Sequence, residues 1–150
     1  MTRFEVSTKW ATRLSALATL GFFLSLAVHV QTLLGATPLG GSKWVFVLHG
    51  GVFLVFIPLA FDLSRFKTLG WRRLFRLIPV WALALCVIAL VYMQVIGRLS
   101  IQPPGAEDAT AKDIRVLRMF SSAWLLFYLM PALYFRWVPK GLGEQGGKAA

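Results

Sequence analysis

The sequence has little of what soluble or catalytic domains usually carry. It holds one cysteine, Cys86, among 150 residues, which excludes a disulfide framework, a CxxC redox pair and a cysteine-based metal site. Asparagine is absent, so no N-glycosylation acceptor exists. Asp and Glu together number only 6. No HExxH, GxSxG, P-loop or GxGxxG pattern and no paired-carboxylate arrangement indicates an enzyme.

What the chain does have is apolar residues in long runs. Hydrophobic residues make up 57% of it, and its mean hydropathy is +0.68, whereas soluble domains are roughly 45–50% apolar. The 16 Lys and Arg residues fall in short stretches between these runs and form no basic face of the kind that binds nucleic acid. We therefore expect the apolar runs to contact a lipid bilayer, and we expect no nucleic-acid partner.

Four runs are long enough to cross about 30 Å of hydrocarbon as helices. These predicted spans are Leu14 to Leu34, Trp44 to Phe61, Leu77 to Ile96 and Met119 to Val138. The predicted fold is therefore all-α, an integral membrane four-helix bundle over residues 1–138, followed by a flexible cytoplasmic tail over 139–150. We expect the first span to be retained, because it exceeds a signal-peptide core of about 7–15 residues and Leu34 occupies a position that cleavage wants small.

Positive charge gives the spans a direction. Of the 16 Lys and Arg residues, eleven lie in the N-terminal segment, the middle connection and the C-terminal segment. The positive-inside rule then places both termini in the cytoplasm. Trp10, Trp71 and Trp137 fall at the inner boundary and Trp44 at the outer one, where amphipathic rings prefer to lie. The absence of Asn and the excess of Arg over Lys indicate a GC-rich bacterial genome, and the predicted location is the bacterial inner membrane.

The two halves of the chain resemble each other. Val28-His29-Val30-Gln31 aligns with Val91-Tyr92-Met93-Gln94, and the segment around Pro58 aligns with the segment around Pro131. A tandem repeat of two helical hairpins would explain the match, with a pseudo-twofold axis along the membrane normal. Chance similarity between apolar helices is the alternative. Both prolines are predicted to kink their spans, either as packing features or as hinges.

The first functional candidates are the two histidines, because lipid offers polar groups no partners. His29 and His49 each lie five residues from the hairpin end of their predicted span, about 7–8 Å below the outer boundary. Tyr92 and Gln94 reach a similar depth on the third span, as do two serines, Ser121 and Ser122, on the fourth.

Small and hydroxyl side chains accompany the histidines. One stripe of the first span carries residues at alternating steps of three and four: Ser15, Ala18, Phe22, Ser25, His29 and Thr32. Such a stripe lets helices approach closely and hydrogen-bond across their interface. Gly50 and Gly51 follow His49 and leave space beside it for a neighbouring helix or a flat ligand.

Three interpretations of this polar layer stay open. His29 and His49 can be neutral and hydrogen-bonded to each other, to Tyr92 or to a hydroxyl, fixing helix register. They can instead be the axial ligands of one b-type haem, with haem iron as the metal. Or His29 or His49, with Tyr92 and Gln94, can hold a quinone headgroup. Zinc is disfavoured because Cys86 is on another helix, and copper would have to recruit methionines.

Two further features involve charge. Asp62, at the inner end of the second span, is predicted to pair with Arg65 or Arg76. In the second outer connection, Asp108 and Lys112 are spaced for a helical ion pair, so the fourth span is expected to begin as a water-exposed helix that either docks a partner or is simply solvated.

Together these observations predict a small non-catalytic inner-membrane protein. Its expected role is that of an accessory or partner-binding subunit, associating with another membrane protein or with further copies of itself. The alternatives are an electron-transfer protein that binds haem or quinone through His29 and His49, and passage of a small neutral solute. No span carries the interior charged residue that ion pathways normally need.

Overall fold

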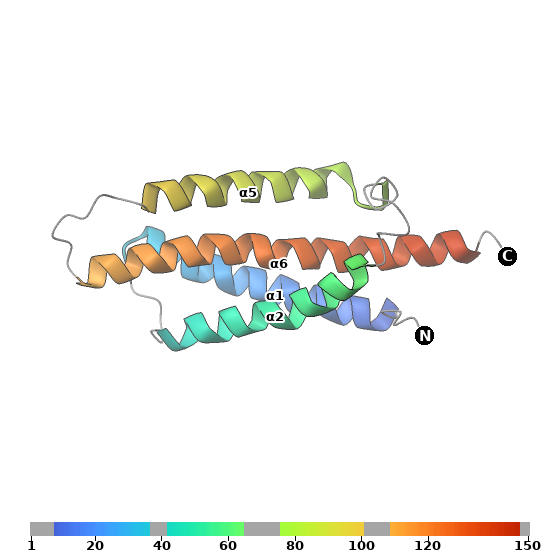
Figure 1. The fold of residues 1–150 in the computed structure, drawn as a ribbon, viewed down its shortest axis with the longest axis horizontal. Coiled ribbons are helices and arrows are strands. Elements are labelled where there is room, and N and C mark those ends of the chain that lie inside the picture. The colour runs from blue at the N-terminus through green and yellow to red at the C-terminus, as the bar shows by residue number, and fades with distance from the viewer. Residues whose placement is uncertain (1–7, 37–41, 65–75, 101–108, 148–150) are drawn as a thin grey trace.

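The chain folds into four helices in the computed structural model, which describes residues 8–36, 42–64, 76–100 and 109–147 (Figure 1). They are α1 (Thr8–Leu33), α2 (Ser42–Ser64), α5 (Val80–Ser100) and α6 (Ala109–Gly147). Each contains one of the four predicted spans or most of it. The prediction of an all-helical fold with four helices is confirmed.

Helix α6 is the central element. It is 39 residues long and packs against all three other helices, while α2 also packs against α1 (Figure 1). In the described part of the chain, the backbone of α5 comes close to α6 alone. The contacts are therefore not twofold symmetric, because α1 packs on α6 whereas α5 does not pack on α2. The tandem repeat stays a prediction.

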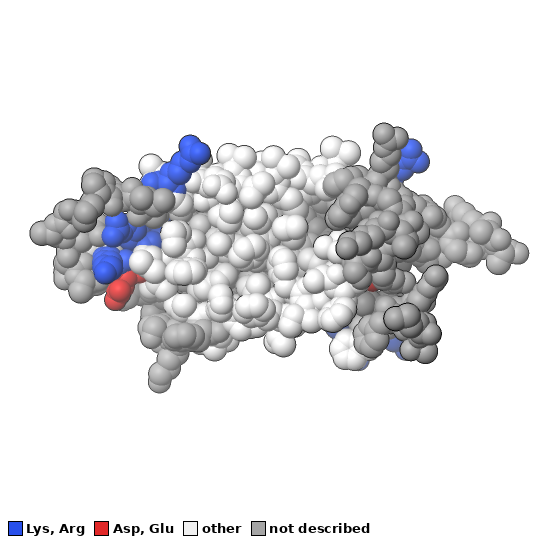
Figure 2. Space-filling view, viewed as in Figure 1, with Lys and Arg blue, Asp and Glu red and all other residues white. Residues whose placement is uncertain are grey.

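Three helices are long and apolar enough to cross a membrane. The qualifying segments are Lys9–Leu33, Val80–Leu99 and Ala111–Val138, and a shorter apolar segment, Val47–Leu63, lies in α2. Large apolar side chains are exposed along all four helices, including Phe61 at 71%. In the view of Figure 2, Lys and Arg gather at the two ends of the molecule, and a broad band between them is uncharged.

The core lies between α1, α2 and α6. One cluster of buried residues surrounds Trp124 and Tyr128, and a second surrounds Phe135 and Val138 nearer the chain termini. Helix α5 adds only Ala82 and Ile96 to the buried apolar residues. It is therefore a peripheral helix. Because it buries few apolar side chains, its polar contacts contribute a larger share of its attachment to the bundle than they would for a fully enclosed helix.

Local signals set two helix boundaries. Gly35, with φ 73°, ends α1 in a Schellman turn, in which Ala36 N–H donates to the Gln31 carbonyl and Gly35 N–H to that of Thr32. Pro79 delays the third helix, so that α5 begins at Val80 and not at the predicted Leu77. The carbonyl of Pro79 accepts the first backbone bonds of α5.

The last helix is longer than the sequence predicted. Its backbone continues to Gly147, through most of the segment expected to form a flexible tail from residue 139. Apolar content marks where a span ends, but adding a residue to an existing helix costs little compared with starting one. Hydropathy alone therefore underestimates the length of α6.

Candidate functional site

The buried polar centre of the molecule is His29, which joins three helices. It lies on α1 and is 2% exposed. Its Nδ1 is 2.8 Å from Ser121 Oγ on α6, and its Nε2 is 2.7 Å from the Tyr92 hydroxyl on α5. The rings of His29 and Tyr92 meet edge to face, 5.5 Å apart. Both ring nitrogens therefore have partners, and α5 is tied to α1 through this side chain.

The neighbours of His29 fix its tautomer. Ser121 uses its only hydroxyl hydrogen to donate to the Arg118 carbonyl, at 3.1 Å. Ser121 Oγ can then only accept from His29, so His29 Nδ1 carries the proton and donates it. In the neutral ring, Nε2 then accepts from the Tyr92 hydroxyl. The arrangement is a directed chain, Tyr92 to His29 to Ser121 to the α6 backbone, which suits a neutral imidazole.

Arg118 secures the end of α1 beside this chain. Its Nη2 donates to the Thr32 carbonyl at 2.6 Å, and the Thr32 hydroxyl donates to the His29 carbonyl at 2.7 Å. A cation at a helix C-terminus is favourable, because the last carbonyls lack helical partners and carry partial negative charge. The sequence did not predict this role, although Arg118 precedes Ser121 by almost one helical turn.

His49 lies in a different environment. It is exposed, and its ring is 5.5 Å from the Phe53 ring on α2 and 6.3 Å from the Trp124 ring on α6. Among the described residues its imidazole forms no hydrogen bond, and it lines a groove of about 330 Å³ between α2 and α6. Among the described residues, the two histidines thus share no hydrogen-bond or ring partner.

The remaining predicted site residues are divided between these environments. Tyr92 bonds His29, but Gln94, two residues further along α5, is exposed and makes no hydrogen bond within the described segments. Gln94 therefore lies outside the His29 cluster. A haem between His29 and His49 would require displacement of a hydrogen-bond partner of His29. In the described part of the chain, no three His, Cys, Asp or Glu side chains cluster in a way that could hold a metal ion.

Tyr128 on α6 is a key side chain that the sequence analysis missed. It is 2% exposed, and its hydroxyl donates to the Leu48 carbonyl of α2 at 2.6 Å. A Cβ added at Gly21 would collide with the Tyr128 ring, and one added at Gly51 with its hydroxyl. The space predicted beside His49 at Gly51 is therefore filled by Tyr128, whereas Gly50 faces open space.

A second buried polar contact lies towards the chain termini. Tyr134 of α6 donates its hydroxyl to Asp62 Oδ2 at 2.8 Å, and Asp62 is 5% exposed. The predicted partner Arg65 lies outside the described residues, and Arg76 is exposed. Tyr134 is a partner of Asp62 that the sequence did not reveal. In the same region, Ser15 of α1 donates to the Ala132 carbonyl at 2.9 Å.

Comparison of the chain with protein-family models, curated proteins and solved structures found no match.

Proposed function

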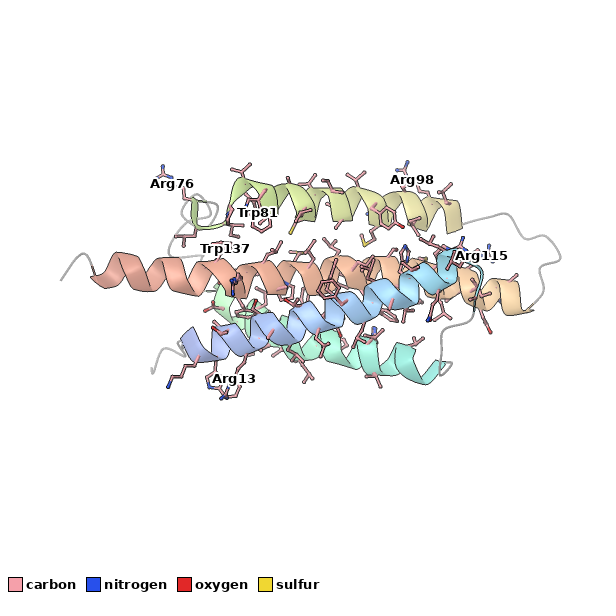
Figure 3. The ribbon with its side chains drawn as sticks, turned by 180° about the vertical axis from the view of Figure 1, so that it is seen from behind. Arg13, Arg76, Trp81, Arg98, Arg115 and Trp137 are labelled. Atoms are coloured by element: carbon pink, nitrogen blue, oxygen red, sulfur yellow. The ribbon has the colours of Figure 1, made fainter. Side chains whose placement is uncertain are left out.

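We propose that the chain is a four-span protein of the bacterial inner membrane with both termini in the cytoplasm. The support is the uncharged band across the middle of the face shown in Figure 2 and the separation of the charges to the two ends of the molecule. Arg13 and Arg76 lie at one end of the helices, and Arg98 and Arg115 at the other (Figure 3). Exposed apolar side chains of this number would be covered by lipid.

This topology is testable with single cysteines in a Cys86→Ser background. Cysteines at Lys112 and Arg76, both exposed, are treated in intact cells with a membrane-impermeant maleimide. We expect labelling at position 112 from outside, and at position 76 only after permeabilisation. The reverse pattern would overturn the orientation, and labelling of both from outside would overturn the four-span arrangement.

Within the membrane, the protein is a non-catalytic accessory subunit that binds a transmembrane helix of another protein through α5. The observation that carries this proposal is the division between interior and surface. The interior polar groups His29, Tyr128, Tyr134 and Ser15 are each bonded to a neighbour and so hold the helices together. Among the described residues, three buried polar atoms have no hydrogen-bond partner: Ser25 Oγ, Arg118 Nε and Trp137 Nε1. The backbone of α5, by contrast, comes close to α6 alone, and many of the large apolar side chains of α5 are exposed.

The exposed side of α5 has the character of a helix-packing face. At alternating steps of four and three it carries small or β-branched side chains and one amide, all exposed: Val80, Ala84, Val87, Val91 and Gln94. Small side chains let two membrane helices approach closely, and an amide between them adds a hydrogen bond worth about 0.6–1.7 kcal/mol. Gln94 facing hydrocarbon would leave its amide unsatisfied, and a partner helix would supply the missing groups.

Cysteine crosslinking in native membranes tests the proposal. In a Cys86→Ser background, a cysteine at Val87 is placed on this face, and one at Leu85, equally on α5 and 42% exposed, lies off it. We expect a crosslink to a different protein from position 87 that is much weaker from position 85 and is reduced by Gln94→Ala. Equal yields from both positions, or a crosslink only between copies of this chain, would overturn the accessory role.

The haem and solute hypotheses receive no comparable support. His29 has both ring nitrogens engaged, and His49 lines a separate groove. We expect the protein purified in mild detergent to show no Soret band before or after dithionite. A reducible band lost in both His29→Ala and His49→Ala would instead identify a b-type cytochrome and overturn this assignment.

A further inference from the structure

A groove of about 780 Å³ lies between α1 and α6 and is bordered on one side by Trp81 of α5. This volume is within the roughly 300–1,000 Å³ that is typical of small-molecule sites. Trp81 and Trp137 lie close together at the end of the molecule nearer the chain termini (Figure 3). In the described part of the chain, the backbones of α1 and α5 make no close contact, so the groove is open to the side of the bundle between them.

The groove changes character along its length. The hydrogen bond from Ser15 to the Ala132 carbonyl, at 2.9 Å, sets the level of α1 against α6. Thr12 and Arg136 line the groove about one helical turn from this bond towards the chain termini, and both side chains are exposed. In the other direction the one polar side chain of the described lining is Thr19, whose hydroxyl donates to the Ser15 carbonyl at 2.8 Å. The apolar lining there includes Leu20, Phe22, Phe23 and Leu129.

Arg136 is the one charged side chain among the described residues that line the groove. It forms no hydrogen bond or ion pair with another described residue, whereas Arg13, at the same end of the molecule, lies over the Trp10 ring at 5.3 Å. A guanidinium presents a planar fork of N–H donors that matches two oxygens of a phosphate. The charge of Arg136 is therefore available to an anion at the polar end of the groove.

The two tryptophans indicate the depth of that end. The rings of Trp81 and Trp137 meet edge to face, with centroids 6.3 Å apart, and Trp137 directly follows Arg136 in the chain. Tryptophan rings prefer the boundary between hydrocarbon and headgroups. In the membrane insertion proposed above, Arg136 thus lies at the level of the phosphates of the cytoplasmic leaflet, and Phe22 and Phe23 lie at the level of the acyl chains.

We infer that this groove binds a phospholipid with a net negative headgroup, with Arg136 donating to the phosphate and an acyl chain lying against Phe22 and Phe23. Basic pockets between membrane helices on the cytoplasmic side bind anionic headgroups in this way. A soluble anion would leave the apolar part of the groove unused, and an uncharged apolar molecule would leave Arg136 without a partner. The inference rests on the membrane insertion and orientation proposed above, and it goes beyond them by naming a lipid site.

Native mass spectrometry of the full chain in mild detergent tests this site. The protein is titrated separately with dioleoylphosphatidylglycerol and with dioleoylphosphatidylcholine, which have the same acyl chains and differ in net headgroup charge. We expect one phosphatidylglycerol to bind in a saturable first step, at lower concentration than phosphatidylcholine does. Arg136→Gln should weaken this step about fivefold, the equivalent of about 1 kcal/mol for one basic residue near an anionic surface, and should leave phosphatidylcholine binding unchanged.

Two further variants separate the groove from general electrostatics. Ala16 lines the groove and is exposed, so Ala16→Phe fills the groove without entering the core and is expected to abolish the saturable step. Arg13→Gln is the matched control, because it removes the same charge at the same end of the molecule but outside the groove lining, and it should bind as the parent protein does.

Three outcomes would each overturn the inference. They are equal affinity for the two lipids, an equal loss of phosphatidylglycerol binding in Arg13→Gln and Arg136→Gln, and saturable binding that survives Ala16→Phe. Unfolding curves in SDS show whether each variant keeps the parent fold, and if Ala16→Phe does not, the comparison of the two arginine variants still decides. The maleimide and crosslinking experiments report on topology and on the α5 face, so their results and this one can fail separately.

Discussion

Replacing Gly51 with alanine is expected to destabilise the bundle, whereas the same change at Gly50 is not. A Cβ at Gly51 would collide with the Tyr128 hydroxyl, which cannot simply swing away because it is buried and bonded to the Leu48 carbonyl at 2.6 Å. At Gly50 a Cβ would meet nothing within 4 Å. Overpacking a buried site costs about 1–3 kcal/mol. Each alanine also gains up to about 1 kcal/mol of helix propensity, which cancels when the two variants are compared.

Tyr128→Phe shows whether the hydroxyl is the cause. Without the hydroxyl, the atom of residue 128 nearest to a Cβ at Gly51 is Cζ at 3.6 Å, an ordinary van der Waals contact. Tyr128→Phe alone is expected to cost about 0.6–1.7 kcal/mol for the lost interhelical hydrogen bond. In that background, Gly51→Ala and Gly50→Ala should be equally stable.

The free energies are measured by SDS unfolding in mixed micelles, followed by tryptophan fluorescence. A difference of about 1–3 kcal/mol between Gly51→Ala and Gly50→Ala in the parent chain is expected. That difference should vanish in the Tyr128→Phe background. Equal stability of the two alanine variants in the parent chain would refute the packing argument. A difference that persists without the hydroxyl would show that a contact other than Tyr128 is responsible.

Three further predictions concern the polar contacts. His29→Ala removes two interhelical hydrogen bonds, to Tyr92 on α5 and to Ser121 on α6, so the free energy of unfolding should fall by about 1.2–3.4 kcal/mol. Because the bond between α1 and α5 is lost, maleimide should react faster with the half-buried Cys86 on α5, whereas Gln94→Ala should change neither quantity. Unchanged reactivity of Cys86 would argue against this link. Arg118→Ala removes the cation that caps the C-terminus of α1 and is expected to lower the free energy of unfolding by about 0.3–1 kcal/mol. Arg118→Lys keeps the positive charge and should recover part of that loss. Tyr134→Phe removes the hydrogen bond from the Tyr134 hydroxyl to the buried Asp62 carboxylate and should lower the free energy of unfolding by about 1.5–3 kcal/mol in the SDS assay. A loss below about 0.5 kcal/mol, the weakest net hydrogen bond, would show that this bond contributes little.

The sequence was most informative where the signal is local. Long apolar runs predict helices, because lipid or a packed core requires each backbone group to bond within its own segment. The stripe on α1 was also readable, since residues three and four apart share a helix face. Its members Ser25, His29 and Thr32 are all buried. The helix ends were less accurate, as the later start of α5 after Pro79 shows.

The sequence offered Tyr92 or a hydroxyl as possible partners of the histidines but did not show which histidine would have them. The depth of His29 and His49 suggested one shared layer, but the structure gives His29 the partners Ser121 and Tyr92 and leaves His49 in an aromatic groove. Depth along a helix gives height only, and the direction in which each side chain points depends on how the helices are rotated about their axes. Tyr128 was missed for the same reason, although Gly21 and Gly51 were a signal that something bulky must fit between α1 and α2.

The amino-acid sequence by itself thus determines four apolar helical segments, the absence of cysteine-based chemistry and the concentration of charge outside the apolar runs, because composition and periodicity act within a segment. The tertiary structure decides that α6 is central, that α5 is peripheral and that His29 is saturated while His49 is not. These outcomes depend on the register and rotation of one helix against another. Close packing of specific side chains, such as Tyr128 against Gly21 and Gly51, sets that geometry across segments far apart in the chain.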